Sequence, residues 1–331
     1  MAIRAVFTVV GLWTVLIAGS VSAEFSIDTV SPDVPAVAEG DILIGFTNLT
    51  PPPLVVTPAA SFGLLIGEEL DALSNGIDTI CPAGSPNCFT IISFSVDRAT
   101  AGMATSVVAG QVAGNGAAGD VFQFEVTGAG VVLVPTSVNT DAPQNSLTIA
   151  PQSSIDALAT AHNVFTAEYF SIAPSVVAAA SVRWGMPGLS PADILLGPGP
   201  VPTVYATEAG LGLVPGDDID GIAINDAAPV GVLSPTDVIY ITLAPGSPSL
   251  AAIPASAADI LQASPGVPAV IYGASLMGLL PSDNLDAISM LDPPINSVPS
   301  IGPAAMLAAV VLFAGTGAGL LWNRGRATSR A

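Results

Sequence analysis

The sequence of 331 residues contains no lysine, one histidine and two cysteines, and only 5% of its residues are aromatic. Six arginines face 26 acidic residues, which gives a formal net charge of −20. Nucleic-acid backbones and anionic headgroups are bound through Lys and Arg, so this balance excludes both as ligands of the acidic middle of the chain. The acidity itself predicts a solvated surface, and the alternative is a dedicated role in binding cations.

The missing side chains also argue against catalysis. A serine nucleophile needs a base, usually histidine, and His162 lies beside no recognisable nucleophile motif. A Gly-x-Ser-x-Gly elbow is absent, and without lysine a Ser-x-x-Lys site is impossible. Two carboxylates suffice for a glycosidase, but only Trp184 lies outside the terminal segments to serve as an aromatic platform. We therefore expect a protein that is not an enzyme, with a secreted carboxylate-dependent hydrolase as the weakest alternative.

Both ends of the chain are predicted to be targeting segments, which direct the protein to its location. Residues 1–23 combine a basic start, an apolar run and a small-residue exit, which predicts a secretory signal peptide cleaved after Ala23; an uncleaved anchor is the alternative. Residues 303–322 form an apolar run long enough to cross a bilayer as a transmembrane helix. The arginine-containing tail 323–331 is then expected in the cytoplasm, and region 24–297 outside the cell.

A short motif lies in the linker 293–302, just before the apolar run. Val298 and Pro299, followed by one apolar helix and a terminal arginine cluster, resemble the tripartite C-terminal sorting signals of bacterial exported proteins, the PEP-CTERM and IPTL-CTERM types. The resemblance implies recognition by a dedicated protease-transpeptidase and display on the cell surface or in the extracellular matrix. A plain membrane anchor is the alternative.

The two cysteines, Cys81 and Cys88, close a short loop that contains Gly, Pro and Asn. In an exported chain such a pair predicts one structural disulfide. A metal site would need further Cys or His ligands nearby, and a redox motif would have the tighter Cys-x-x-Cys spacing.

The middle of the chain repeats one order of phrases four times. The strand-like phrase FSID at Phe25 recurs as FSVD at Phe94, FSIA at Phe170 and ITLA at Ile241. A small residue followed by Asp and two apolar residues comes next, and a phrase like IDAL closes each unit. Repetition near 70 residues indicates a repeat architecture. The repeat domain is predicted to cover 24–292, with units 24–88, 89–164, 165–235 and 236–292.

Each unit is cut by Pro and Gly into about four short apolar runs, without a sustained 3.6-residue period. An all-β fold is therefore predicted. Four units of four strands favour a four-bladed β-propeller; two stacked β-sandwiches or a linear array of β-domains are the alternatives. The phrases FSVDR, SPADIL and LGLVPGDD make the chain similar to a group of uncharacterised repeat-bearing exported bacterial proteins. This resemblance implies export and the fold, but no catalytic activity.

The acidic phrases that close the units are the candidate ion sites. Oxygen ligands that alternate along a turn can bind Ca²⁺; solvated turns whose carboxylates bind backbone are the alternative. In a ring, the Asp of each closing phrase would converge near the axis, where such charges are costly without a cation or a raised pKa. The candidate calcium ligands are Asp71, Asp156, Asp220, Asp286, Asp217, Asp218 and Asp283.

These features together predict a non-catalytic exported protein of the cell surface or the extracellular matrix. The alternative is a calcium-dependent adhesion module that binds a surface glycan or protein.

Overall fold

The computed structural model describes residues 23–28, 37–44, 53–74, 89–104, 106–113, 117–127, 132–133, 155–160, 168–197, 201–226, 231–263 and 267–290. These residues form an all-β structure with a few short helices, as the sequence predicts. Four of the sequence-based predictions lie outside them: the signal peptide, the disulfide between Cys81 and Cys88, the motif at Val298 and Pro299, and the apolar run 303–322. None of the helices in the described ranges is both long and apolar enough to span a membrane.

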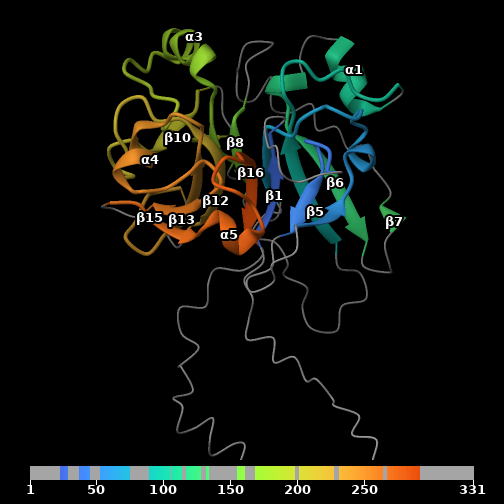
Figure 1. Cartoon of the computed structure of the whole chain (residues 1–331). Helices are drawn as coiled ribbons and strands as arrows, with labels where there is room; N and C mark the ends of the chain where they lie inside the picture. Colours follow the sequence, from blue (N-terminus) through green and yellow to red (C-terminus); the bar gives the residue numbers. More distant parts are fainter. Residues whose placement is uncertain are drawn as a thin grey trace, which may run out of the picture. The chain divides into compact units, whose positions relative to one another are not determined.

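The described strands form four antiparallel sheets of four strands each (Figure 1). The first sheet has the order β16 (Leu285–Met290), β1 (Ala23–Ile27), β2 (Ile42–Ile44) and β3 (Leu54–Thr57). The second contains β4 (Ala72–Ser74), β5 (Phe89–Ser95), β6 (Phe122–Thr127) and β7 (Val132–Leu133). The third contains β8 (Ala157–Thr160), β9 (Glu168–Ser171), β10 (Ile194–Gly197) and β11 (Thr203–Ala206). The fourth contains β12 (Ile219–Asn225), β13 (Val238–Leu243), β14 (Ile260–Ala263) and β15 (Ala269–Tyr272).

The sheets are offset by one strand from the sequence repeats. The strand that closes each predicted unit opens the next sheet, so that Ala72 of β4 lies opposite Ser95 of β5. The closing strand of the fourth unit, β16, pairs with β1, and Phe25 lies opposite Ile288. The first and the last described strands therefore belong to one sheet.

One edge strand of every sheet meets the corresponding strands of the other three. Each of β4, β8, β12 and β16 contacts all the others. A small residue follows the Asp in each of these strands: Ala72, Ala157 and Ala287 are fully buried, and Gly221 takes this place in β12. A Cβ atom on Gly221 would lie 3.2 Å from the backbone nitrogen of Ile288 in β16. The repeated Asp-Ala or Asp-Gly pair thus allows the strand backbones to approach closely.

The buried hydrophobic residues form four clusters, three between sheets that are consecutive in the chain and one between the first and the fourth sheet. Phe94 joins the first and second sheets, Phe170 the second and third, and Tyr169 the third and fourth. The remaining cluster contains Phe25 of the first sheet and Tyr240 of the fourth. The few aromatic residues contribute to these cores, since Phe94 stacks on Phe122 at 5.3 Å, and the rings of Tyr169 and Tyr205 meet edge to face at 4.8 Å.

The helices are short and lie in the connections. They are α1 (Val107–Ala113), α3 (Pro174–Trp184), α4 (Pro248–Ala252), α5 (Ala274–Met277) and two 3-10 helices, Ala59–Phe62 and Ala117–Gly119. The longest of them, α3, has eleven residues. It begins with Pro174, which is preset for a first helical position, and it ends at Gly185 in the left-handed conformation.

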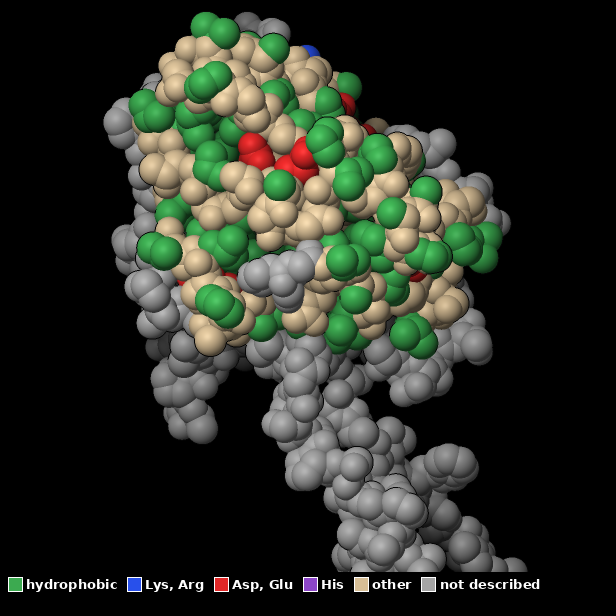
Figure 2. Space-filling view, turned by 90° about the vertical axis from the view of Figure 1, so that its left-hand side faces the viewer, with side chains coloured by type: hydrophobic (Ala, Val, Ile, Leu, Met, Phe, Trp, Pro, Cys, Tyr) green, Lys and Arg blue, Asp and Glu red, His purple; other side chains and the backbone are tan. Residues whose placement is uncertain are grey.

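Much of the acidity is inside the molecule rather than on a solvated surface. Nine of the described acidic residues are buried: Glu24, Asp41, Asp120, Glu168, Asp193, Asp217, Asp220, Asp237 and Asp283. On the face drawn in Figure 2, acidic side chains show only in small groups among hydrophobic and uncharged surface. A buried carboxylate needs hydrogen-bond donors or a cation, so the partners of these side chains decide their role.

Candidate cation site

One set of acids binds backbone amides in turns. Asp217 accepts hydrogen bonds from the backbone N–H of Val214 (2.8 Å) and of Ser249 (2.8 Å), and its Oδ2 also accepts the Ser249 hydroxyl at 2.5 Å. Asp283 accepts the N–H of Leu280 at 2.8 Å. These contacts favour the turn interpretation for Asp217, because both of its oxygens already accept hydrogen bonds within the fold. Asp283 uses only one oxygen in this way, and its Oδ1 is buried without a hydrogen-bond partner.

The Asp that precedes the second strand of a repeat unit has a similar role. Asp259 accepts the N–H of Ser256 (2.7 Å), three residues earlier, and the N–H of Ala274 (2.6 Å), at the start of α5. Asp41 and Asp193 make the same two kinds of bond. One comes from an N–H three residues earlier, and the other from an N–H that follows the third strand of the repeat unit. The recurrence of this Asp in the sequence therefore reflects a structural link, and these carboxylates are not available to a ligand.

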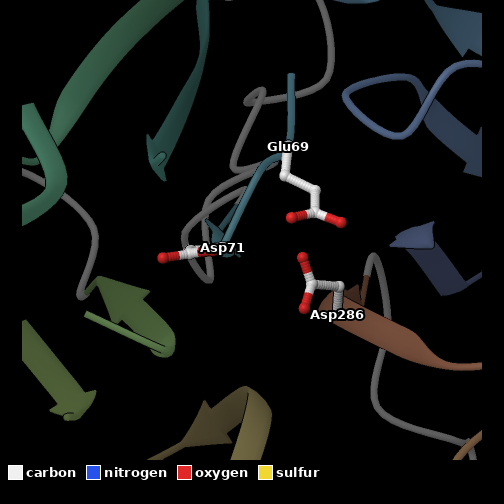
Figure 3. A group of neighbouring side chains, drawn as sticks. All are labelled: Glu69, Asp71 and Asp286. Carbon is white, nitrogen blue, oxygen red and sulfur yellow. The ribbon is translucent and has the colours of Figure 1, made fainter. Parts of the chain in front are cut away.

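A different set of acids meets where β4 and β16 begin. One carboxylate oxygen from each of Glu69, Asp71 and Asp286 can be chosen so that all three lie within 4.8 Å of one another. Glu69 and Asp71 immediately precede β4, and Asp286 is the second residue of β16. Figure 3 shows the carboxylates of Glu69 and Asp286 directed toward each other.

Asp286 carries the most confined oxygen of this acidic cluster, which we define as Glu69, Asp71 and Asp286. The side chain as a whole is partly buried, but its Oδ2 is shielded from solvent and has no hydrogen-bond partner. Burial raises the pKa of Asp286 well above its usual value, and the charge of Asp71 and of other nearby acids raises it further. An isolated buried carboxylate is unstable unless it is protonated or paired with a positive charge.

Further acids surround the cluster. Asp220 of β12 accepts a hydrogen bond from Asn284 Nδ2 at 3.3 Å. Burial, followed by the charge of Asp218, raises the pKa of Asp220 well above its usual value, although the Asn284 bond lowers it. Burial and then Asp71 have the same raising effect on Asp156, and burial alone raises the pKa of Asp218 to about 7. The predicted convergence of Asp71, Asp156, Asp220 and Asp286 is consistent with these mutual influences.

Basic side chains are few in the described ranges. The basic residues of this part of the chain are Arg98 and Arg183, and both are exposed. The single histidine, His162, lies outside the described residues. Protonation or a bound cation would reduce the negative charge of the acidic cluster.

No family model, curated protein or solved structure matches this chain. Residue roles therefore follow from the geometry of this chain alone.

The acidic cluster contains one residue that is absent from the ligand set expected from the sequence. Glu69 was not predicted as a ligand, yet it is part of the acidic cluster. The signal that could have found it is the two-residue period of an extended chain, which puts Glu69 and Asp71 on one side and Glu68 on the other. Glu68 indeed points elsewhere and accepts the N–H of Leu65 at 2.6 Å and of Ala101 at 2.7 Å.

Proposed function

We propose that this chain is a non-catalytic exported protein whose folded part is a four-bladed β-propeller, held on the cell surface or in the extracellular matrix. The observation that carries the proposal is the pairing of β1 with β16. A core shared by the first and the fourth sheet, beside three cores between sheets that are consecutive in the chain, also fits a closed ring. A ring leaves few open sheet edges, and that suits a domain exposed outside the cell, where unpaired edges invite aggregation.

The alternative arrangements agree less well with the contacts. A linear array of β-domains would leave its first and last sheets without a common core, whereas Phe25 and Tyr240 lie in one cluster. Two stacked sandwiches would not require contacts among all four edge strands β4, β8, β12 and β16.

Cysteine cross-linking tests the closure of the ring. Ser26 and Ala287 lie opposite each other in β1 and β16, so a Ser26→Cys and Ala287→Cys double variant should form a disulfide when the folded protein is oxidised. Trypsin needs Lys or Arg, and between residues 24 and 292 only Arg98 and Arg183 offer a cleavage site. After denaturation and digestion without reductant, the first and last fragments should stay joined. Each single variant is the control, and separate fragments from the double variant would exclude closure.

The proposed location on the cell surface depends on the two predicted targeting segments, the signal peptide and the C-terminal sorting segment, which flank the described domain. Strand β1 starts at Ala23, the predicted cleavage position, and β16 ends at Met290, shortly before the sorting-like motif in 293–302. The proposed partners are accordingly a sorting protease-transpeptidase and, through the apolar run 303–322, a membrane.

Cell fractionation tests display and separates it from plain anchoring. In cells that produce the full chain, the domain should be cut by protease added outside and should appear in the surface or released fraction. A Val298→Ala and Pro299→Ala double variant should remain in the membrane, while the matched control Ser297→Ala should be processed like the wild type. Equal retention of wild type and double variant would indicate a plain anchor, and a cytoplasmic domain would refute export.

A further inference from the structure

The acidic cluster combines two independent features of a cation site. Its carboxylate oxygens converge from two different sheets, since β4 belongs to the second sheet and β16 to the first. In addition, Oδ2 of Asp286 is shielded from solvent and has no hydrogen-bond partner, although the side chain is directed toward Glu69 (Figure 3). Hydrogen bonds from backbone N–H groups compensate for the burial of the Asp217 and Asp259 carboxylates. No hydrogen bond compensates for the burial of Asp286 Oδ2.

We propose that Glu69, Asp71 and Asp286 bind one calcium ion at the meeting point of the edge strands. The inference depends on these contacts alone and not on export or display. Of the ligand set expected from the sequence, it keeps Asp71 and Asp286. It adds Glu69 and leaves out the residues that do not belong to the acidic cluster: Asp156, Asp217, Asp218, Asp220 and Asp283.

The spacing of the oxygens accommodates calcium, and the ligand chemistry favours it. Calcium binds oxygen ligands at about 2.3–2.6 Å, so two ligands on opposite sides of one ion lie about 5 Å apart. The three oxygens lie within 4.8 Å of one another and therefore fit around one such ion with small adjustments. Magnesium requires about 2.0–2.1 Å and near-ideal octahedral geometry, and zinc prefers nitrogen and sulfur ligands, which the described part of this cluster does not offer.

The surrounding charge adds to the attraction. Asp220 is near enough to raise the pKa of Asp286, and Asp71 does the same for both Asp156 and Asp220. A divalent cation at the cluster would relieve repulsion among all of these side chains. The remaining coordination positions of the ion are available to water or to backbone oxygens, as is common for calcium.

Calorimetry on the purified full chain measures the binding directly. Protein freed of metal with a chelator is titrated with calcium chloride, and we expect one ion per chain with a dissociation constant in the millimolar range or tighter, as in extracellular calcium modules. Because calcium binds the native state, a concentration well above the dissociation constant should also raise Tm by several degrees. Magnesium chloride at equal concentration is the control for charge screening and should give a much smaller shift.

Two substitutions separate a ligand from a structural residue. Asp286→Asn should weaken calcium binding at least tenfold, yet in chelator it should melt no lower than the wild type, because it removes a buried negative charge from a repulsive cluster. Asp71→Asn provides a second, independent loss of affinity. The matched control Asp217→Asn should melt lower, since it disturbs a turn, but should keep its calcium affinity within about twofold.

Several results would overturn the proposal. These are the absence of heat and of any Tm shift with calcium, an equal shift with calcium and magnesium, or unchanged calcium affinity in Asp286→Asn and Asp71→Asn. Loss of affinity in Asp217→Asn alone would move the site to the turn acids and would equally refute the ligand set given above.

Discussion

Replacing Gly221 with alanine tests the close approach of β12 to β16. A Cβ atom at this position would lie 2.5 Å from Oγ1 of Thr242, 3.0 Å from Cγ1 of Ile288 and 3.2 Å from the Ile288 backbone nitrogen. The Thr242 hydroxyl is buried and short, so it cannot swing clear of the new methyl group. Relief then requires β12 to shift relative to both β13 and β16, and overpacking of this kind costs about 1–3 kcal/mol.

The expected result is a lower melting temperature for Gly221→Ala. At about 2 kcal/mol, and with a shift of roughly 2–4 °C per kcal/mol for a domain near this size, Tm should fall by about 4–8 °C. Differential scanning calorimetry or urea unfolding measures the change. Gly110→Ala is the matched control: Gly110 lies in α1 with no atom within 4 Å of the new Cβ, and alanine should stabilise the helix by about 0.5–1 kcal/mol.

A rescue variant makes the reasoning specific. Adding Thr242→Ala to Gly221→Ala removes the nearest obstructing atom, so the double variant should recover part of the loss through a favourable coupling. The reasoning is refuted if Gly221→Ala melts at or above the wild-type temperature, or if the Thr242→Ala and Gly221→Ala losses simply add.

Three further outcomes follow from buried polar groups. Asp259→Ala should cost about 2–4 kcal/mol in urea unfolding, because it strands the N–H of Ala274, now bonded at 2.6 Å. Tyr205→Phe should cost only about 1 kcal/mol, since it removes one 2.8 Å bond to Asp237, which keeps other donors. Burial raises the pKa of Glu168 from 4.5 to about 7, so the folded chain binds a proton more tightly, and stability falls by up to about 3 kcal/mol as the pH rises through that window. Glu168→Gln should remove this loss, and a stability difference from wild type that is equal at pH 5 and pH 8 would contradict it.

The strands were predictable because Pro and Gly divide each repeat unit into short apolar runs, and these runs form the strands. The runs EYFSIA, ADILL, TVYAT and DIDGIAI of the third unit correspond to β9, β10, β11 and β12. The pairing of β12 with β13, rather than with the other strands of its own unit, was not predictable from local patterns. Strand pairing depends on packing between units, which a periodicity in one segment does not encode.

The sequence predicted where the candidate site lies, but not which of the acidic residues form it. The alignment of the acidic phrases pointed to Asp71 and Asp286, and the structure brings them together. The phrase could not separate Asp217 from Asp220, because the distinction depends on the donor that each carboxylate meets: Ser249 for the former and Asn284 for the latter. Ser249 is 32 residues from Asp217, and Asn284 is 64 residues from Asp220, so neither contact is visible in a local pattern.

The pairing of β1 with β16 has a consequence for the time course of folding. Strand β16 is the last described strand to leave the ribosome, so β1 must wait for almost the whole domain before its neighbour exists. Contacts between such distant segments make folding slow, and until then one side of β1 is an open edge to which another chain can add. Dilution or a chaperone during synthesis should therefore raise the yield of folded protein far more than it changes the stability of the finished molecule.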